Sequence, residues 1–210
     1  MTIDIPTHIA AIARAVSRLP EDGATGERIG VSLRRTYDAP PEDVWDALTD
    51  PDRIARWFMP VTGDLRVGGT FEAEGNAAGE ILACDPPQLL RVSWGGPTSI
   101  VELRLVADGG RTQLELAHNV PVEIAQNGAG ALWVGPGWDG ALMGLALYLG
   151  GEPIGDPAEM AASREVQEFS GASVREWAAA VEASGTATGE ELAQATEISL
   201  AQFAPDVSGR

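Results

Sequence analysis

Hydrophobic and polar residues alternate over several short segments in the middle of the chain. Between Ile29 and Tyr37 apolar positions recur at every second residue, and the same period returns in Ser99–Ala107 and Arg111–Asn119. Because successive side chains of a strand point to opposite faces, this period predicts half-buried strands. Turns rich in Gly, Pro and Asp separate the segments, and such short connections predict antiparallel neighbours. Three further strands are expected over Gly69–Gly75, Ala78–Cys84 and Gln88–Trp94.

Helical spacing of apolar residues replaces this alternation on both sides of the strands. It appears in Asp38–Thr49, where Pro41 suits the first turn of a helix, and Asp50-Pro51 repeats the same start signal for a second short helix. The run Gly137–Leu149 is apolar on nearly every side, which indicates a helix enclosed by other elements. The patterns predict an α+β protein in which a curved antiparallel sheet wraps around one long helix.

The two ends of the chain carry amphipathic patterns of their own. A one-sided apolar stripe over Ile3–Leu19 predicts an N-terminal helix, and a linker over Pro20–Gly30 follows it. Two apolar stripes near the C-terminus predict a helical hairpin, with Thr188 and Glu191 as a capping box for its second helix. The expected organisation is an N-terminal helix and linker over 1–28, a central domain over 29–150 and a C-terminal helical extension over 151–210.

The charge balance narrows the choice of partners. The chain has 31 acidic and 14 basic side chains and a formal net charge of -17, so phosphate backbones and anionic lipid headgroups are repelled. We therefore expect neither nucleic acid nor a membrane as a partner. Cys84 is the only cysteine, and no apolar signal segment precedes the globular pattern, which predicts a cytoplasmic protein.

Residues for metal, nucleotide or acyl-transfer chemistry are scarce. His8 and His118 are the only histidines and no Cys/His cluster exists, so we expect no dedicated metal site. The sequence has neither the glycine-rich phosphate loops nor the nucleophile elbow of serine hydrolases. We therefore expect no cofactor and identify no catalytic residue.

The segment from Arg35 to Phe58, which includes Tyr-Asp-Ala-Pro-Pro-Glu-Asp-Val-Trp, resembles the opening of START-like (SRPBCC) domains in the branch named for the activator of the heat-shock protein 90 ATPase. The similarity continues through Gly68-Gly69-Thr70-Phe71, the Pro-Pro-Gln-Leu-Leu-Arg-Val-Ser-Trp segment at 86–94 and Gly137-Trp138, and covers about residues 29–150. The resemblance implies the helix-grip fold and, for the superfamily, a cavity between sheet and long helix that takes apolar or aromatic small molecules. It implies no single reaction, because members of one fold serve many functions.

The candidate ligand-binding residues are those expected to line such a cavity, whose usual volume is roughly 300–1,000 Å³. Ordinary core packing is the competing interpretation for each of them taken singly. The set is Trp57, Phe58, Phe71, Trp94, His118, Trp138 and Met143.

Three side chains carry more specific expectations. His118 follows Leu114 and Leu116 in phase, so it should point inward, either as a proton-exchanging group or as a satisfied histidine at the edge of the core. Arg35 should also point inward and pair with a carboxylate, for which Glu72 and Glu102 are the candidates. Cys84 has no basic neighbour in sequence, and we expect it to be inert.

The first functional hypothesis is non-catalytic binding of an apolar or aromatic small molecule. A co-chaperone-like module that binds a chaperone or another protein is the first alternative, and an exposed apolar patch would favour it. A cyclase- or hydratase-type enzyme that uses His118 or an inward carboxylate as general base is the second. Whether the C-terminal hairpin packs on its own domain, covers the cavity mouth or forms a homodimer stays open.

Overall fold

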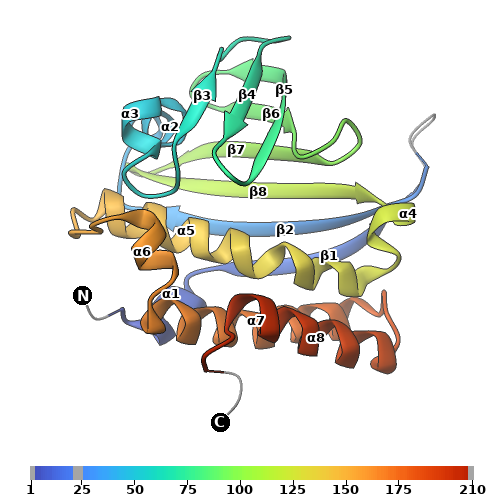
Figure 1. The fold of residues 1–210 in the computed structure, drawn as a ribbon. Helices are drawn as coiled ribbons and strands as arrows, with labels where there is room; N and C mark the ends of the chain where they lie inside the picture. Colours follow the sequence, from blue (N-terminus) through green and yellow to red (C-terminus); the bar gives the residue numbers. More distant parts are fainter. Residues whose placement is uncertain (1–2, 21–25, 208–210) are drawn as a thin grey trace.

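The computed structural model describes residues 3–20 and 26–207, and a single antiparallel sheet of eight strands dominates it (Figure 1). The strands are ordered β1-β2-β8-β7-β6-β5-β4-β3, and the sheet curves around the long helix α5 (Gly135–Leu149). The strand bounds are β1 Ala13–Leu19, β2 Arg28–Tyr37, β3 Val61–Gly63, β4 Thr70–Ala73, β5 Ala77–Asp85, β6 Leu89–Ser93, β7 Ile100–Asp108 and β8 Arg111–Pro121.

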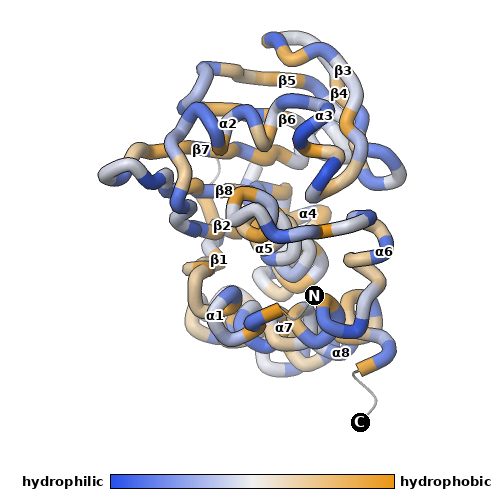
Figure 2. Tube along the Cα trace, turned by 90° about the vertical axis from the view of Figure 1, so that its left-hand side faces the viewer, coloured by the Kyte–Doolittle hydropathy of each residue, from blue (hydrophilic) through white to orange (hydrophobic). Residues whose placement is uncertain are grey.

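Helices cover one face of this sheet in two layers. Helix α5 lies directly on the sheet, and a second layer of α1, α7 and α8 encloses it from the other side (Figure 2). The predicted α+β, helix-grip architecture is confirmed. The remaining bounds are α1 Ile5–Ala10, α2 Pro41–Thr49, α3 Pro51–Ile54, α4 Val122–Ala125, the 3₁₀ helix η2 Gly128–Trp133, α6 Pro157–Ala161, α7 Arg164–Ser184 and α8 Gly189–Phe203.

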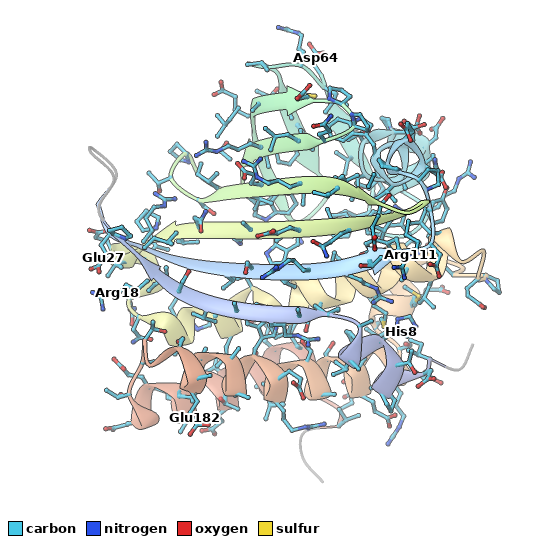
Figure 3. All side chains as sticks on the ribbon, turned by 180° about the vertical axis from the view of Figure 1, so that it is seen from behind. His8, Arg18, Glu27, Asp64, Arg111 and Glu182 are labelled. Carbon is cyan, nitrogen blue, oxygen red and sulfur yellow. The ribbon has the colours of Figure 1, made fainter. Side chains whose placement is uncertain are left out.

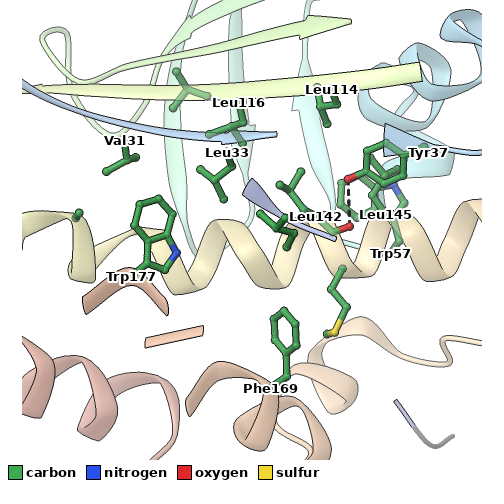
Figure 4. Close-up of a cluster of buried hydrophobic side chains, with 14 of the residues drawn as sticks. Val31, Leu33, Tyr37, Trp57, Leu114, Leu116, Leu142, Leu145, Phe169 and Trp177 are labelled. Atoms are coloured by element: carbon green, nitrogen blue, oxygen red, sulfur yellow. Dashed lines mark hydrogen bonds between the residues drawn. The ribbon is translucent and has the colours of Figure 1, made fainter. Parts of the chain in front are cut away.

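The core lies on both sides of α5. Leu142 and Leu145 project from α5 toward the strands, while Phe169 and Trp177 lie on the side of α7 (Figure 4). The Tyr37 hydroxyl on β2 donates a hydrogen bond to the Leu142 carbonyl over 3.1 Å, which ties the helix to the sheet. Contact with the sheet on one side and with α7 on the other explains why α5 carries apolar side chains on most of its surface, while Gly137 is exposed.

Most of the predicted elements are present. Strand β2, helices α2 and α3, and the five strands from β4 to β8 lie where alternation and spacing place them. Asp50 caps α3 by accepting a hydrogen bond from the Arg53 amide at 3.0 Å, and Thr188 and Glu191 form the expected capping box of α8. The C-terminal hairpin packs on its own domain, with α7 against α5 and β1.

The expectation of a helix over Ile3–Leu19 is wrong beyond residue 10. Only Ile5–Ala10 is helical, and Ala13–Leu19 forms strand β1, antiparallel to β2 at the edge of the sheet. Ile12 and Val16 are both buried, and their spacing of four suits one face of a helix as well as one face of a strand. Arg14 lies between them on the same strand face and hides the alternation, because its buried charge is paired within the protein.

Three other differences concern segments without a strong period. Residues 21–25 of the predicted linker lie outside the described residues, and Arg28–Gly30 already belong to β2. The three-residue strand β3 was not predicted. The segment predicted as irregular between Pro121 and Pro136 contains α4 and η2. The division into domain and appendages at residues 28 and 150 stays a prediction.

The charged side chains labelled in Figure 3 lie at the periphery of the molecule. Arg18 and Glu27, for example, form an ion pair near the ends of β1 and β2, and each side chain is more than two fifths exposed. Exposed pairs of this kind contribute only about 0–1 kcal/mol, so the core and not the surface charge stabilises the fold. No helix within residues 3–20 and 26–207 is both long and apolar enough to cross a membrane.

An apolar pocket between the sheet and helix α5

A pocket of about 200 Å³ lies between the curved sheet, α3 and α5. Almost all of its wall is hydrophobic. Asp64 alone among the lining residues is charged, and its carboxylate pairs with Arg66 at the surface. The wall is formed by Leu48, Thr49, Pro51, Ile54, Trp57, Phe58, Val61, Thr62, Gly63, Asp64, Leu65, Phe71, Ile81, Leu90, Val92, Trp94, Val101, Leu103, Leu114, Leu116, Trp138, Ala141, Leu142 and Leu145.

Regular spacing explains why these residues share one wall. On β8, Leu114 and Leu116 are two residues apart and therefore lie on the same face of the sheet. On α5, the four lining residues follow the spacing i, i+3, i+4, i+7 and form one stripe of the helix: Trp138, Ala141, Leu142 and Leu145. The same alternation that predicts the strands thus builds the pocket.

Five of the seven candidate residues line this pocket: Trp57, Phe58, Phe71, Trp94 and Trp138. Their rings are in contact. Ring centres are 5.5 Å apart for Trp57 and Phe58, 5.6 Å for Phe71 and Trp94, and 5.1 Å for Trp94 and Trp138. Separations of 4.5–7 Å are typical of stabilising aromatic pairs, so the rings support one another as well as line the hollow.

His118 points inward, as its phase with Leu114 and Leu116 predicts, but it lies behind Trp138 and not in the pocket wall. The Trp138 indole N–H donates to His118 Nδ1 over 3.1 Å, and His118 Nε2 lies 2.8 Å from Ser99 Oγ. Because an indole nitrogen is only a donor, Nδ1 must be the acceptor, and the ring proton therefore resides on Nε2. Burial, with a smaller contribution from the positive charge of Arg28, lowers the pKa of His118 to about 4. The side chain is neutral at pH 7 and holds Trp138 in place.

Met143 is buried but is not among the lining residues. It shares a face of α5 with Gly135 and Asp139, at intervals of four residues, and this face packs against α7. A Cβ atom at Gly135 would lie 2.4 Å from Trp177, which shows how closely the two helices approach. Met143 thus belongs to the packing between helices.

Arg35 does not pair with Glu72 or Glu102. Its Nη2 lies 3.0 Å from His8 Nδ1, and its guanidinium carbon lies 5.6 Å from the centre of the Tyr37 ring. Burial lowers the pKa of Arg35, while Tyr37 and Asp139 favour its charged form. The expectation of an acidic partner failed because Glu102 pairs with Arg104 on the outer face of the sheet.

The sequence analysis missed a buried carboxylate, that of Asp139. It binds Arg14 Nε at 2.7 Å and accepts a hydrogen bond from Ser173 Oγ, and so joins α5, β1 and α7. Burial raises the pKa of Asp139 to about 6, while Arg14 and Ser173 oppose that rise. A signal was available: Asp139 is the only charged residue between Gly135 and Leu149, and a buried charge requires a partner.

The described residues show neither a grouping that could bind a metal ion nor an activated cysteine. No three His, Cys, Asp or Glu side chains there are grouped so that they could hold a metal ion. Burial and the nearby Asp85 raise the pKa of the Cys84 thiol, which disfavours the reactive thiolate. Trp133 is partly exposed and does not line the pocket.

The family model described as "Activator of Hsp90 ATPase homolog 1-like protein" matches residues 38–150, more than half of the chain. The chain belongs to this family. The resemblance inferred from Arg35–Phe58 and the segments after it is thereby confirmed. No curated protein matches the sequence.

Solved structures similar to this chain include CalU16 from Micromonospora echinospora. It has 40% sequence identity and a TM-score of 0.66, and the match covers 82% of this chain and 99% of CalU16. DynU16, described as a protein in the dynemicin biosynthetic locus, has 26% identity and a TM-score of 0.53, with 59% of this chain and 48% of DynU16 covered. EF2215 from Enterococcus faecalis, at 16% identity, a TM-score of 0.58 and coverage of 84% and 95%, shows the same fold.

Proposed function

We propose that this protein is a cytoplasmic binder of an uncharged, apolar or aromatic small molecule, which it holds between the sheet and α5 without catalysing a reaction. The observation that supports this most directly is the composition of the pocket wall, in which aromatic and aliphatic side chains converge and only Asp64 is charged. Small-molecule sites are typically concave and mostly apolar. A charged ligand would lose its hydration in such a pocket without gaining a partner.

The size of the pocket limits what can occupy it. Its volume of about 200 Å³ lies below the usual range of roughly 300–1,000 Å³ for drug-sized ligands. It suits one compact ring system, such as a bicyclic aromatic. The contacting rings of Phe71, Trp94 and Trp138 offer both faces and edges to such a ligand.

The state of His118 supports a non-catalytic role. A general base works best when its pKa lies near the operating pH, whereas the pKa of His118 is lowered to about 4. The lone pair of Nδ1 is also occupied by the Trp138 N–H. For the cyclase- or hydratase-type alternative, this histidine is therefore a poor candidate base.

The test is a fluorescence titration with 2-methoxynaphthalene as the probe, a compact and uncharged bicyclic aromatic. Ala141 lines the pocket, and Ala141→Leu should fill part of it and weaken binding about tenfold or more. Ala146 lies on the same helix with a similar partial burial but does not line the pocket, so Ala146→Leu is the matched control. It should bind within about twofold of the wild type, and thermal unfolding should show that both variants are folded. Absence of binding by the wild type, or equal losses in both variants, would contradict the proposal.

A protein-binding role is the second candidate, and the family description is the observation that favours it. Two exposed apolar side chains, Leu65 and Val67, lie together on the connection between β3 and β4. Others, including Val106 and Ile198, lie on separate elements. Stimulation of an Hsp90 ATPase by the purified protein would favour this role over small-molecule binding. The protein could act in this role as a monomer or as a homodimer.

A further inference from the structure

Two more hollows lie beyond the aromatic rings of the inner pocket. The first has a volume of about 320 Å³, and His118, Ser99 and Trp133 contribute to its wall. The second has a volume of about 260 Å³, and Gly137, Gln202 and Phe203 contribute to it. We call them the outer hollows.

The same aromatic side chains border the inner pocket and the outer hollows. Trp94 lines all three spaces, and Trp138 and Phe58 line both the inner pocket and the second outer hollow. Only side chains therefore separate these spaces at this point. The ring centres of Trp94 and Trp138 are 5.1 Å apart, and the single hydrogen bond of the Trp138 indole goes to His118.

The outer hollows differ from the inner pocket in the polar groups that they offer. Ser99, Thr98 and His118 line the first, and Asn76, Gln202 and His118 line the second. No Asp, Glu, Lys or Arg lines either hollow among the described residues, although the chain has 31 acidic and 14 basic side chains. Both ring nitrogens of His118 are engaged, so the hydroxyls of Ser99 and Thr98 and the amides of Asn76 and Gln202 are the groups that can form hydrogen bonds with a ligand. None of them can neutralise a charge.

Two distant parts of the chain hold the walls of the outer hollows. Arg28 on β2 donates hydrogen bonds to the carbonyls of Thr98 and Asn119, and so fixes the β6–β7 connection beside the first hollow. Gln202 and Phe203 come from the last turn of α8, so the C-terminal extension forms part of the wall of the second hollow.

We propose that the inner pocket and the outer hollows form one elongated site, divided by the Trp94–Trp138 pair, and that its ligand is an uncharged molecule of two parts. An apolar ring system occupies the inner pocket, and a chain with hydrogen-bonding groups passes the tryptophan pair into the outer hollows. This inference rests on the proposed function and adds to it the class of ligand and a role for the C-terminal extension.

Two probes that share one ring system test the inference. The short probe is 2-methoxynaphthalene, and the long probe is 6-(2-naphthyloxy)hexan-1-ol, whose chain ends in a hydroxyl group. Burial of one methylene group contributes about fourfold in affinity, so the long probe should bind at least about tenfold more tightly to the wild type. Dissociation constants are measured by equilibrium dialysis of the full chain.

A variant in the outer hollow then shows where the chain binds. A Cβ atom at Gly137 would lie 3.6 Å from Phe203, an ordinary contact, so Gly137→Leu should fold and fill the second hollow. This variant should lose most of the difference in affinity between the long and the short probe. Its dissociation constant for the short probe should stay within about twofold of the wild-type value. Gly140 is one turn further along α5, lies in open space and lines none of the three spaces. Gly140→Leu is therefore the control and should preserve the advantage.

The outcomes separate this inference from the proposed function. If the short probe binds but the long probe is no tighter, or if Gly137→Leu and Gly140→Leu affect the long probe equally, the elongated site is overturned while the inner pocket stands. If neither probe binds to the wild type, both proposals are contradicted. If the long probe binds the wild type and Gly140→Leu more tightly than the short probe does, and Gly137→Leu removes this difference, the elongated site is supported.

Discussion

His118 and Trp138 show how one hydrogen bond fixes the protonation state of a buried side chain. Protonation of His118 at Nδ1 would place a new N–H against the indole N–H of Trp138, so the contact of 3.1 Å would have to break. Burial also disfavours the charged ring, and both effects act in the same direction on its pKa. A single sequence position, two residues beyond a leucine of β8, therefore decides the orientation of the tryptophan that divides the proposed site.

This lowered pKa makes the stability of the protein depend on pH. The pKa of His118 falls from 6.5 to about 4 on folding, so between these values the unfolded state binds more protons. The stability contributed by the neutral ring is fully present above about pH 6.5 and is lost as the pH falls through about 4, by up to about 3 kcal/mol. Asp139, whose pKa is raised to about 6, contributes in the opposite direction over an overlapping pH range and is present in both proteins. In urea denaturation between pH 7 and 4, the stability of the wild type relative to His118→Gln should therefore fall as the pH falls.

A control is needed because the pKa of His8 is also lowered, chiefly by burial and then by the positive charge of Arg35. His8→Gln should keep most of the pH dependence, since the ring of His8 is only partly buried. If the wild type and His118→Gln lose stability in parallel as the pH falls, the neutral, hydrogen-bonded state of His118 is refuted.

At the scale of elements, α5 carries two different faces. One lines the pocket with Trp138, Ala141, Leu142 and Leu145, and the other packs on α7 through Gly135 and Asp139. The ion pair of Asp139 with Arg14 fixes the rotation of the helix, and its side chains are only 0% and 5% exposed. Trp138 precedes Asp139 directly, so the buried ion pair also determines where the pocket wall lies.

Asp139→Ala should destabilise the protein by about 3–5 kcal/mol, because it leaves the guanidinium of Arg14 buried without its carboxylate. Asp139→Asn should cost less, since the amide oxygen can still accept a hydrogen bond from Ser173 or Arg14. Asp108, which pairs with Arg111 at the surface with both side chains more than half exposed, is the control, and Asp108→Ala should change stability little. Urea denaturation measures all three, and equal losses for Asp139→Ala and Asp108→Ala would argue against the role of the buried pair.

The elements that the sequence predicts are those whose period is unambiguous. Strands β7 and β8 alternate cleanly, whereas the spacing of Ile12 and Val16 fits a helix and a strand equally, and β3 has only three residues. The aromatic members of the pocket could be predicted because rings of that size need burial or a ligand. The place of Met143 on the other face of α5, and of Asp139 beside Arg14, depends on how the helix is rotated between sheet and α7, which no local pattern specifies.

The whole molecule is more tightly integrated than the extent of the family match suggests. The match covers residues 38–150, yet strand β1 extends the sheet before it and α7 completes the core after it. Phe169, Val174, Trp177 and Val181 of α7 are fully buried. An element that contributes four such side chains to the common core is expected to fold together with the sheet, not as a separate appendage.

Removal of the extension should therefore disrupt the domain itself. A chain that ends at Gly150 would expose the face of α5 that carries Gly135 and Met143, together with the Asp139–Arg14 ion pair, which would also lose the hydrogen bond from Ser173. We expect such a chain to bind the dye 1-anilinonaphthalene-8-sulfonate and to lose cooperative urea unfolding, as loosely packed states do.

In the full chain, Trp177→Ala should destabilise the protein by about 3–5 kcal/mol, while Ile198→Ser on the half-exposed face of α8 should change stability little. A truncated chain with an unchanged, cooperative transition would show that residues 151–210 are a separable extension, and the second outer hollow, which needs Gln202 and Phe203, would then have to form by docking of an independent unit.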